Sequence, residues 1–319
     1  MIALREDAVK IFFLGVEVYA FGLYVAIGLA LALVALALLT RRSHWKKETA
    51  PVAGLLGIIF GLALSRLLYG LLDEALGRVV PLWGMIRLET GGYSMIGALA
   101  GGCLGGMLAA RLTGQDPVRM LDVLSPALLL FVACERLGEG YILDFGVSRT
   151  LTDGLLEGTF LAVENDGTWR LATYLLESFA SLILSLILIR DLNEKRRRGD
   201  TFLLFLLLYG AVQTLLESLR YDQHMTVIAF VKLQQVFAMA LLGVAVILLA
   251  LRRWNTRRKT AIAGMAAVVC AVGLGVAIEF MIDRTTISHY LLYLAFLAVI
   301  AAPTALGLAL RKEELGGKA

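Results

Sequence analysis

Nine apolar runs, each long enough to cross a bilayer as a helix, constrain this 319-residue sequence more than any other feature. A transmembrane helix needs roughly 20 mainly apolar residues to span about 30 Å of hydrocarbon. Only helices and closed barrels satisfy their backbone polar groups at that depth, and these runs lack the alternation of barrel strands. The sequence therefore predicts an all-α, polytopic membrane protein with nine spans: Val18–Thr40, Pro51–Leu72, Gly91–Leu112, Leu121–Glu139, Leu171–Ile189, Thr201–Arg220, Val227–Leu251, Ala261–Ile282 and His289–Leu310.

The basic residues follow the odd-numbered spans. The first predicted span, for example, is followed by Arg41, Arg42, Lys46 and Lys47, whereas the loops after even-numbered spans are mixed or acidic. Because Lys and Arg accumulate in cytoplasmic loops, this pattern predicts an outer N-terminus and a cytoplasmic C-terminus. It also places residues 140–170 outside, as a small cap. Topology explains the basic runs, and no nucleic-acid-binding module is recognisable.

Ionisable side chains cluster where the fourth predicted span ends, in the stretch ACERLGEGYILDFG (133–146). Arg136 and Glu139 are at i and i+3, so one helix face brings them within reach of each other, and Glu135 precedes them. Glu217 and Arg220 repeat the spacing at the end of the sixth span. Ionisable groups at membrane depth are costly and by default indicate a functional site.

Three other ionisable residues interrupt apolar spans. Arg66 either reaches the membrane surface by snorkelling or belongs to a site. Glu177 and Glu279 favour interhelical polar contacts over catalysis. In the third predicted span Gly97, Gly101 and Gly105 recur every four residues, which favours close helix–helix packing, while the bare face could also make room for a lipid or peptide.

Several of these stretches together resemble the prolipoprotein diacylglyceryl transferase family of bacterial inner-membrane enzymes. The resemblance is carried by GGYSMIGALAGG (91–102), CERLGEGYILDFG (134–146), LYGAVQTLLESLRYD (208–222), VYAFGLYVAIG (18–28) and VKLQQ (231–235). It covers roughly residues 15–252, and seven spans is the number that the family uses. The division expected is therefore a seven-span core, 1–252, followed by a two-helix extension, 253–319.

The resemblance implies a reaction and a set of site residues. The family moves a diacylglyceryl group from phosphatidylglycerol to the lipobox cysteine thiol of a prolipoprotein, needs no cofactor or metal, and works at the outer face of the membrane. The implied partners are phosphatidylglycerol or a related anionic lipid, the prolipoprotein signal-peptide region and the bilayer. From the residues and the resemblance together we expect as catalytic residues Glu139, Glu217 and Tyr209, and as lipid- and phosphate-binding residues Arg136, Arg220, Gln213, Gly138, Ser94 and Gly97. Glu139 either acts as a base or neutralises Arg136.

The sequence departs from the family's pattern at identifiable positions. The family's histidine falls at Ile96, its signature asparagine at Glu139 and its first-helix tyrosine at Phe21. Gln213 stands where the family has one of its two phosphate-binding arginines. Asp144 stands where the family has a glutamate. The residues that agree with the family's pattern are Arg136, Gly138, Tyr209, Gly210, Glu217, Arg220 and Gln235.

Three functions remain open at this point. The first is the family's transferase reaction. The second keeps the fold and alters the chemistry, giving a lipid- or partner-binding membrane protein or a lipid-modifying enzyme with a different acceptor. The third, a transporter, predicts repeated halves, and no convincing repeat is found. The transferase reading further predicts that Arg136, Glu139, Gln213, Glu217 and Arg220 line one cavity.

Overall fold

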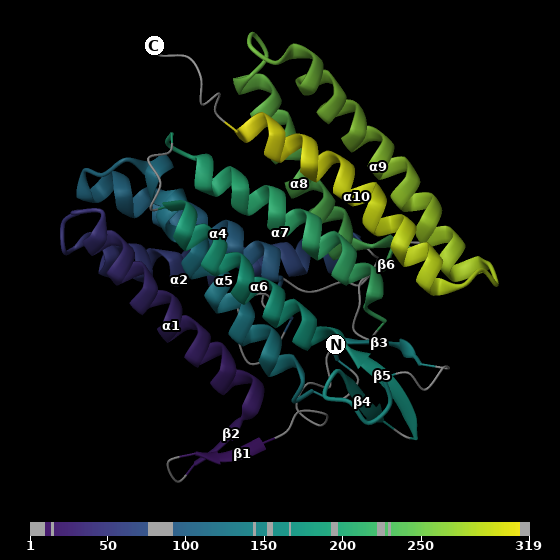
Figure 1. Cartoon of the computed structure of the whole chain (residues 1–319). Coiled ribbons are helices and arrows are strands. Elements are labelled where there is room, and N and C mark those ends of the chain that lie inside the picture. The colour runs from purple at the N-terminus through teal and green to yellow at the C-terminus, as the bar shows by residue number, and fades with distance from the viewer. Residues whose placement is uncertain are drawn as a thin grey trace. The chain divides into compact units, whose positions relative to one another are not determined.

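The computed structural model describes residues 10–13, 16–75, 92–142, 145–151, 156–165, 167–192, 197–221, 227–228 and 231–312. Gly91 and Asp144 lie outside these ranges. Within them the chain forms nine helices (Figure 1): α1 (Ala20–Arg42), α2 (Thr49–Ala75), α4 (Met95–Thr113), α5 (Pro117–Glu139), α6 (Thr173–Leu192), α7 (Asp200–Leu219), α8 (Leu233–Arg252), α9 (Arg258–Arg284) and α10 (His289–Arg311).

The helices occur where the apolar runs predict them, which confirms the helical membrane fold. Eight helices of the described chain are long and apolar enough to cross a membrane. The ninth, α6, forms over the predicted fifth span but is not among those eight. The predicted seventh span began too early: Val227–Ile228 (β6) and Val231–Lys232 (β7) form a small antiparallel hairpin, and α8 begins at Leu233. The β-branched residues of this segment favour extended backbone over helix.

The segment between α5 and α6 contains a small antiparallel sheet. Its strands are β3 (Val147–Thr150), β4 (Ala162–Asn165) and β5 (Thr168–Ala172), with β5 in the centre. A further hairpin, β1 (Lys10–Phe13) with β2 (Val16–Tyr19), leads into α1. Strands β3, β4 and β5 occupy part of the segment predicted to form an external cap, and on which side of the membrane they lie stays a prediction.

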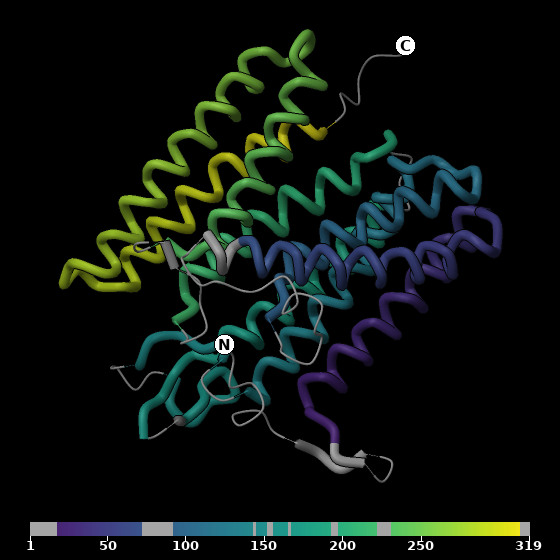
Figure 2. The backbone as a smooth tube through the Cα atoms, turned by 180° about the vertical axis from the view of Figure 1, so that it is seen from behind, coloured from purple at the N-terminus to yellow at the C-terminus, as the bar shows by residue number. Residues whose placement is uncertain are grey.

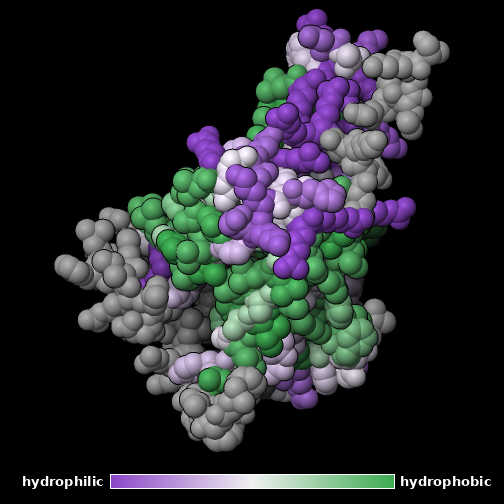
Figure 3. Space-filling model, turned by 90° about the vertical axis from the view of Figure 1, so that its left-hand side faces the viewer, coloured by the Kyte–Doolittle hydropathy of each residue, from purple (hydrophilic) through white to green (hydrophobic). Residues whose placement is uncertain are grey.

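Many large apolar side chains are exposed on the helices while several ionisable side chains are buried, which is unlike a water-soluble protein. On α1 the exposed side chains include Leu31, Val34 and Leu38 (47, 56 and 59% exposed), one helical stripe. Arg136, Glu139 and Glu217, by contrast, are at most 2% exposed. The surface in Figure 3 accordingly divides into a hydrophobic zone and hydrophilic zones. Many exposed apolar side chains on helices of membrane-spanning length indicate a lipid-facing surface.

The contacts divide the chain into two compact units, and the boundary crosses α6 between Glu177 and Ser178. Unit 1 comprises residues 1–146 and 178–201, and unit 2 comprises residues 147–177 and 202–319. In unit 1, α4 packs on α2, and α5 on α1 and α4. In unit 2, α8, α9 and α10 pack against one another, and both ribbon views show α9 and α10 side by side (Figures 1 and 2). The predicted division at residue 252 stays a prediction.

Glycines set the closest helix approaches in unit 1. A Cβ atom added at Gly97, Gly101 or Gly105 would meet backbone atoms of α2 at 2.2–2.5 Å. This is the close packing predicted from the glycine spacing, with small residues allowing two backbones to meet. The bare face of these three glycines is therefore covered by α2.

Candidate functional site

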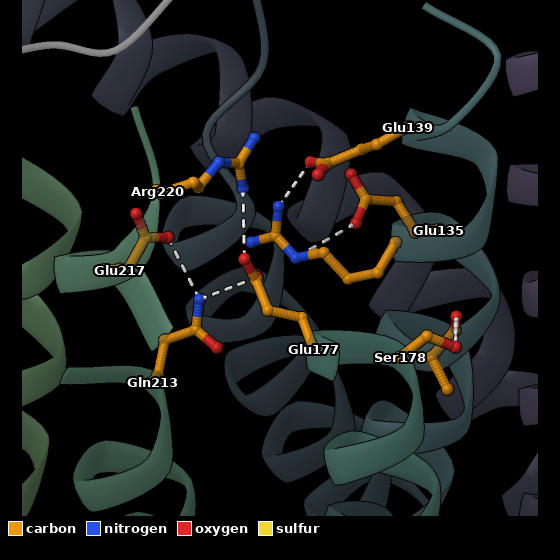
Figure 4. Close-up of polar contacts among 9 residues, drawn as sticks. Glu135, Glu139, Glu177, Ser178, Gln213, Glu217 and Arg220 are labelled. Atoms are coloured by element: carbon orange, nitrogen blue, oxygen red, sulfur yellow. Dashed lines mark hydrogen bonds and ion pairs between the residues drawn. The ribbon is translucent and has the colours of Figure 1, made fainter. Parts of the chain in front are cut away.

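The end of α5 carries an acid–base cluster in unit 1. Arg136 forms an ion pair with Glu139, as the i,i+3 spacing predicts, and its Nε lies 3.7 Å from Glu135 Oε2. Figure 4 shows both labelled carboxylates turned toward this guanidinium. Arg136 and Glu139 are each 2% exposed, so the pair is shielded from water and its electrostatic attraction is stronger than at a surface.

Gly138 brings α1 against this end of α5. A Cβ atom at Gly138 would lie 2.9 Å from Tyr24 Cβ and 3.2 Å from Phe21 Cδ2. The hydroxyl of Tyr24 is 3.2 Å from that of Tyr141, and the two rings stack with centroids 5.2 Å apart. The missing side chain thus serves helix packing next to Arg136; a direct role of Gly138 in lipid binding stays a prediction.

In unit 2, α7 carries the second cluster along one face. Tyr209, Gln213 and Glu217 are four residues apart, so they form a stripe along the helix axis. Tyr209 is buried and stacks on Phe205, with centroids 5.4 Å apart. At about 1.5 Å rise per residue, Tyr209 lies roughly 12 Å along the axis from Glu217. The helix places Gln213 between them.

Gln213 joins two buried carboxylates. Its Nε2 donates hydrogen bonds of 3.0 Å to Glu177 Oε2 and to Glu217 Oε1, and Figure 4 shows the amide turned toward both. Arg220 Nη1 lies 3.5 Å from Glu177 Oε1. All four side chains are buried. The cluster thus holds one cation and two acids around a neutral donor.

The residues before α4 form an anchored turn in unit 1. Ser94 is the N-cap of α4: its Oγ accepts from the Gly97 N–H at 3.3 Å. Ser65 Oγ donates to Ser94 O at 2.8 Å, and Arg66 Nη1 donates to Gly92 O at 2.7 Å. Arg66 also lies 5.1 Å from the Tyr93 ring centroid. Ser94 and Gly97 therefore define the start of α4, and Arg66 faces the protein rather than the membrane surface.

Two acids that the sequence assigned to interhelical contacts do make them. Glu177 bonds to Gln213 of α7, and Glu279 Oε1 of α9 accepts from Gln235 Nε2 of α8 at 2.7 Å. Sequence reasoning did not single out Lys232, a buried cation whose Nζ donates to main-chain oxygens of Glu217 and Ser218. A lysine next to a hydrophobic run gives no local sign that it will be buried.

Each cluster has groups suited to acid–base work and anion binding. Arginine offers five N–H donors in a planar fork that matches phosphate oxygens, and buried carboxylates can accept protons. Among the described residues no group of three or more His, Cys, Asp or Glu side chains could hold a metal ion. The two clusters provide arginine, carboxylate and amide side chains.

Comparison with known proteins identifies the family. The prolipoprotein diacylglyceryl transferase family model matches residues 9–251. The chain is 27% identical over 254 residues to the phosphatidylglycerol–prolipoprotein diacylglyceryl transferase of Bacillus licheniformis, covering 76% of this chain and 91% of that protein. The Bacillus velezensis protein of the same name is 26% identical over 254 residues, 74% of this chain and 89% of that protein. The protein is a multi-pass membrane protein that belongs to the prolipoprotein diacylglyceryl transferase family.

Proposed function

We propose that this protein transfers a diacylglyceryl group from phosphatidylglycerol to the lipobox cysteine thiol of a prolipoprotein, at the outer face of a bacterial cytoplasmic membrane. The family match over residues 9–251 carries the proposal, and relatives named for this activity support it. In the reaction the cysteine sulfur forms a thioether bond to a glycerol carbon. The bond from that carbon to the phosphate oxygen breaks, and glycerol phosphate leaves while the thiol proton passes to a base.

Arg136 and Arg220 are the proposed phosphate-binding groups. Each is at most 5% exposed in its own unit and close to a carboxylate, so the guanidinium plane is held before a ligand arrives. Preorganised donors are more effective than mobile ones because they need no rearrangement during the reaction. Arginine also presents two parallel N–H groups to a phosphate, which lysine cannot.

Carboxylates are the proposed proton acceptors. Glu139 beside Arg136 and Glu217 beside Gln213 are both buried, and either can receive the thiol proton. Gln213 supports this role through its bonds to Glu177 and Glu217. Tyr209, on the same face of α7 as Glu217, is a further proposed catalytic residue in unit 2. In unit 1, Gly138, Ser94 and Gly97 are proposed to support lipid binding through the packing and capping described above.

The test is reconstitution into phosphatidylglycerol vesicles with a lipobox-cysteine peptide. Mass spectrometry looks for a thioether-linked diacylglyceryl adduct, which we expect from the unaltered protein and expect to fall at least about tenfold with Arg136→Ala, since a charge-assisted bond contributes about 1.5–3 kcal/mol. Arg119→Ala is the matched control, because Arg119 is an exposed arginine on the same helix. No adduct, beside an active relative in the same vesicles, would refute the proposed reaction.

A lipid-binding protein with altered chemistry is the second candidate. The observation that favours it is the set of departures from the family's pattern at Ile96, Phe21, Glu139 and Gln213, which alter the chemical groups and leave Arg136 in place. In the same vesicles this candidate predicts phosphatidylglycerol binding that depends on Arg136, with no adduct. An enzyme with a different acceptor would instead consume the lipid without modifying the peptide.

A further inference from the structure

Lys232 caps the C-terminal end of α7. Its Nζ donates hydrogen bonds of 2.7 Å to both Glu217 O and Ser218 O, and the side chain is 8% exposed. The last carbonyls of a helix have no partner within the helix and carry its negative dipole end, so an ammonium group is favoured there. This lysine therefore fixes the turn that carries Glu217 and precedes Arg220.

Glu279 of α9 connects to the same end of α7 by a second route. Its carboxylate accepts from Gln235 Nε2 at 2.7 Å, and that amide nitrogen lies 3.4 Å from Thr214 O of α7. Glu279 is 4% exposed and Gln235 also 4%. A buried carboxylate needs partners of this kind to offset its desolvation. The acid of α9 thus orients the amide of α8 toward α7.

The pair α9–α10 is tightly attached to the rest of unit 2. Asp283 forms an ion pair with Arg149 of β3, and the Arg149 guanidinium lies 4.3 Å from the Tyr221 ring centroid. On α10, a Cβ atom at Gly307 would meet Leu207 Cδ1 of α7 at 2.6 Å. These helices lie beyond residues 9–251, which match the family. The family match alone therefore assigns them no role.

We infer that Glu279 is a positioning residue, which acts through Gln235 and through the charge of Lys232 on the end of α7 that carries Glu217 and precedes Arg220. The inference rests on the proposed function, because it assigns α9 to the support of the proposed transferase site. It gives the C-terminal helices a task beyond membrane anchoring: Glu279 supplies, from outside residues 9–251, the buried carboxylate that accepts from Gln235.

The charges around Lys232 agree with this assignment. Burial lowers the pKa of Lys232, and the negative charges of Glu279 and Glu217 oppose that effect, while Arg149 and Arg220 add to it. Removing the charge of Glu279 therefore lowers this pKa further. The charged cap on α7 is then lost at a lower pH.

The experiment compares Glu279→Gln, Glu279→Asp and the control Asp283→Asn in the full chain. The control makes the same change one turn further along α9, where Asp283 pairs with Arg149. Hydrogen exchange of a peptide covering residues 214–219, which leaves out Tyr221 beside Arg149, is measured in micelles. We expect about fivefold faster exchange in Glu279→Gln, a smaller change in Glu279→Asp and none in Asp283→Asn, because loss of an anchor allows local opening.

Kinetics in vesicles give the second readout. We expect kcat to fall about tenfold in Glu279→Gln and to recover partly in Glu279→Asp, since misplaced groups slow the chemical step. We also expect the alkaline limb of activity in Glu279→Gln to shift to lower pH. Unchanged exchange in Glu279→Gln, or equal effects of Asp283→Asn, would overturn the inference. Faster exchange limited to Glu279→Gln, in a protein that forms no adduct, would retain the positioning role and refute only the proposed function.

Discussion

At the scale of single residues, Gln213 shows how one amide can hold two buried acids. Both Glu177 and Glu217 accept from its Nε2 at 3.0 Å. A buried carboxylate that loses a hydrogen-bond donor is destabilising, because its desolvation is no longer offset by that hydrogen bond. The neutral side chain at this position, where the family has a cation, is therefore part of the fold as well as a candidate for the site.

Replacing Gln213 by Leu should destabilise the protein by about 1–3 kcal/mol, because two buried acceptors lose their common donor. Thermal unfolding in detergent micelles measures the effect. Thr214→Val is the matched control, since within the described part of the chain the Thr214 hydroxyl bonds to Gly210 O of its own helix at 2.6 Å. An equal loss of stability in the two variants would mean that the hydrogen bonds from Gln213 to the two glutamates do not stabilise the fold.

Asp116, the N-cap of α5, gives a pH-dependent prediction. Partial burial raises its pKa, but hydrogen bonds from the Arg119 and Val118 N–H groups, together with Arg198, outweigh burial and lower the pKa below its usual value. The stability that the ionised Asp116 contributes is therefore present above about pH 4, the usual pKa, and is lost as the pH falls through the lowered one.

Asp116→Asn keeps a capping side chain and removes the charge. We expect the melting temperature of the variant to lie slightly below that of the unaltered protein at pH 6 and to meet it near pH 3. The effect is small because the carboxylate is partly exposed to solvent, which screens its charge. A constant difference at both pH values would contradict the electrostatic explanation.

At the scale of helices, the two faces of α4 respond to side chains in opposite ways. A Cβ atom at Gly101 would lie 2.2 Å from Phe60 O, a main-chain atom that cannot turn aside. At Gly102 it would meet only the end of the Leu128 side chain, at 3.2 Å. Neighbouring glycines thus serve different purposes on one helix.

Gly101→Ala should cost about 1–3 kcal/mol through forced separation of α2 and α4. Gly102→Ala, its matched control, should be neutral or stabilising by up to about 1 kcal/mol, because alanine favours the helix. Denaturation of both variants in micelles measures the difference. Equal stability of the two would show that α2 and α4 do not depend on the contact at Gly101.

At the scale of the whole molecule, the charge pattern predicts an orientation in the membrane. In a variant whose Cys103, Cys134 and Cys270 are replaced by alanine, single cysteines are introduced at Glu157 and at Lys47, both exposed. An impermeant maleimide should label Glu157→Cys in intact cells and Lys47→Cys only after permeabilisation, because Lys-rich loops stay cytoplasmic. The reverse labelling would show that the N-terminus lies inside.

The sequence by itself determined the positions of the helices, because each membrane helix must satisfy its backbone within its own apolar run. It also determined the Arg136–Glu139 pair, whose i,i+3 spacing is local. Spacing cannot reveal partners from different helices, so only the tertiary structure decided that Glu177 meets Gln213 and that Glu279 meets Gln235. The predicted start of α8 was too early because an apolar run looks the same in a short hairpin and in a helical turn. Only the pairing of β6 with β7 in the tertiary structure shows that the helix begins later.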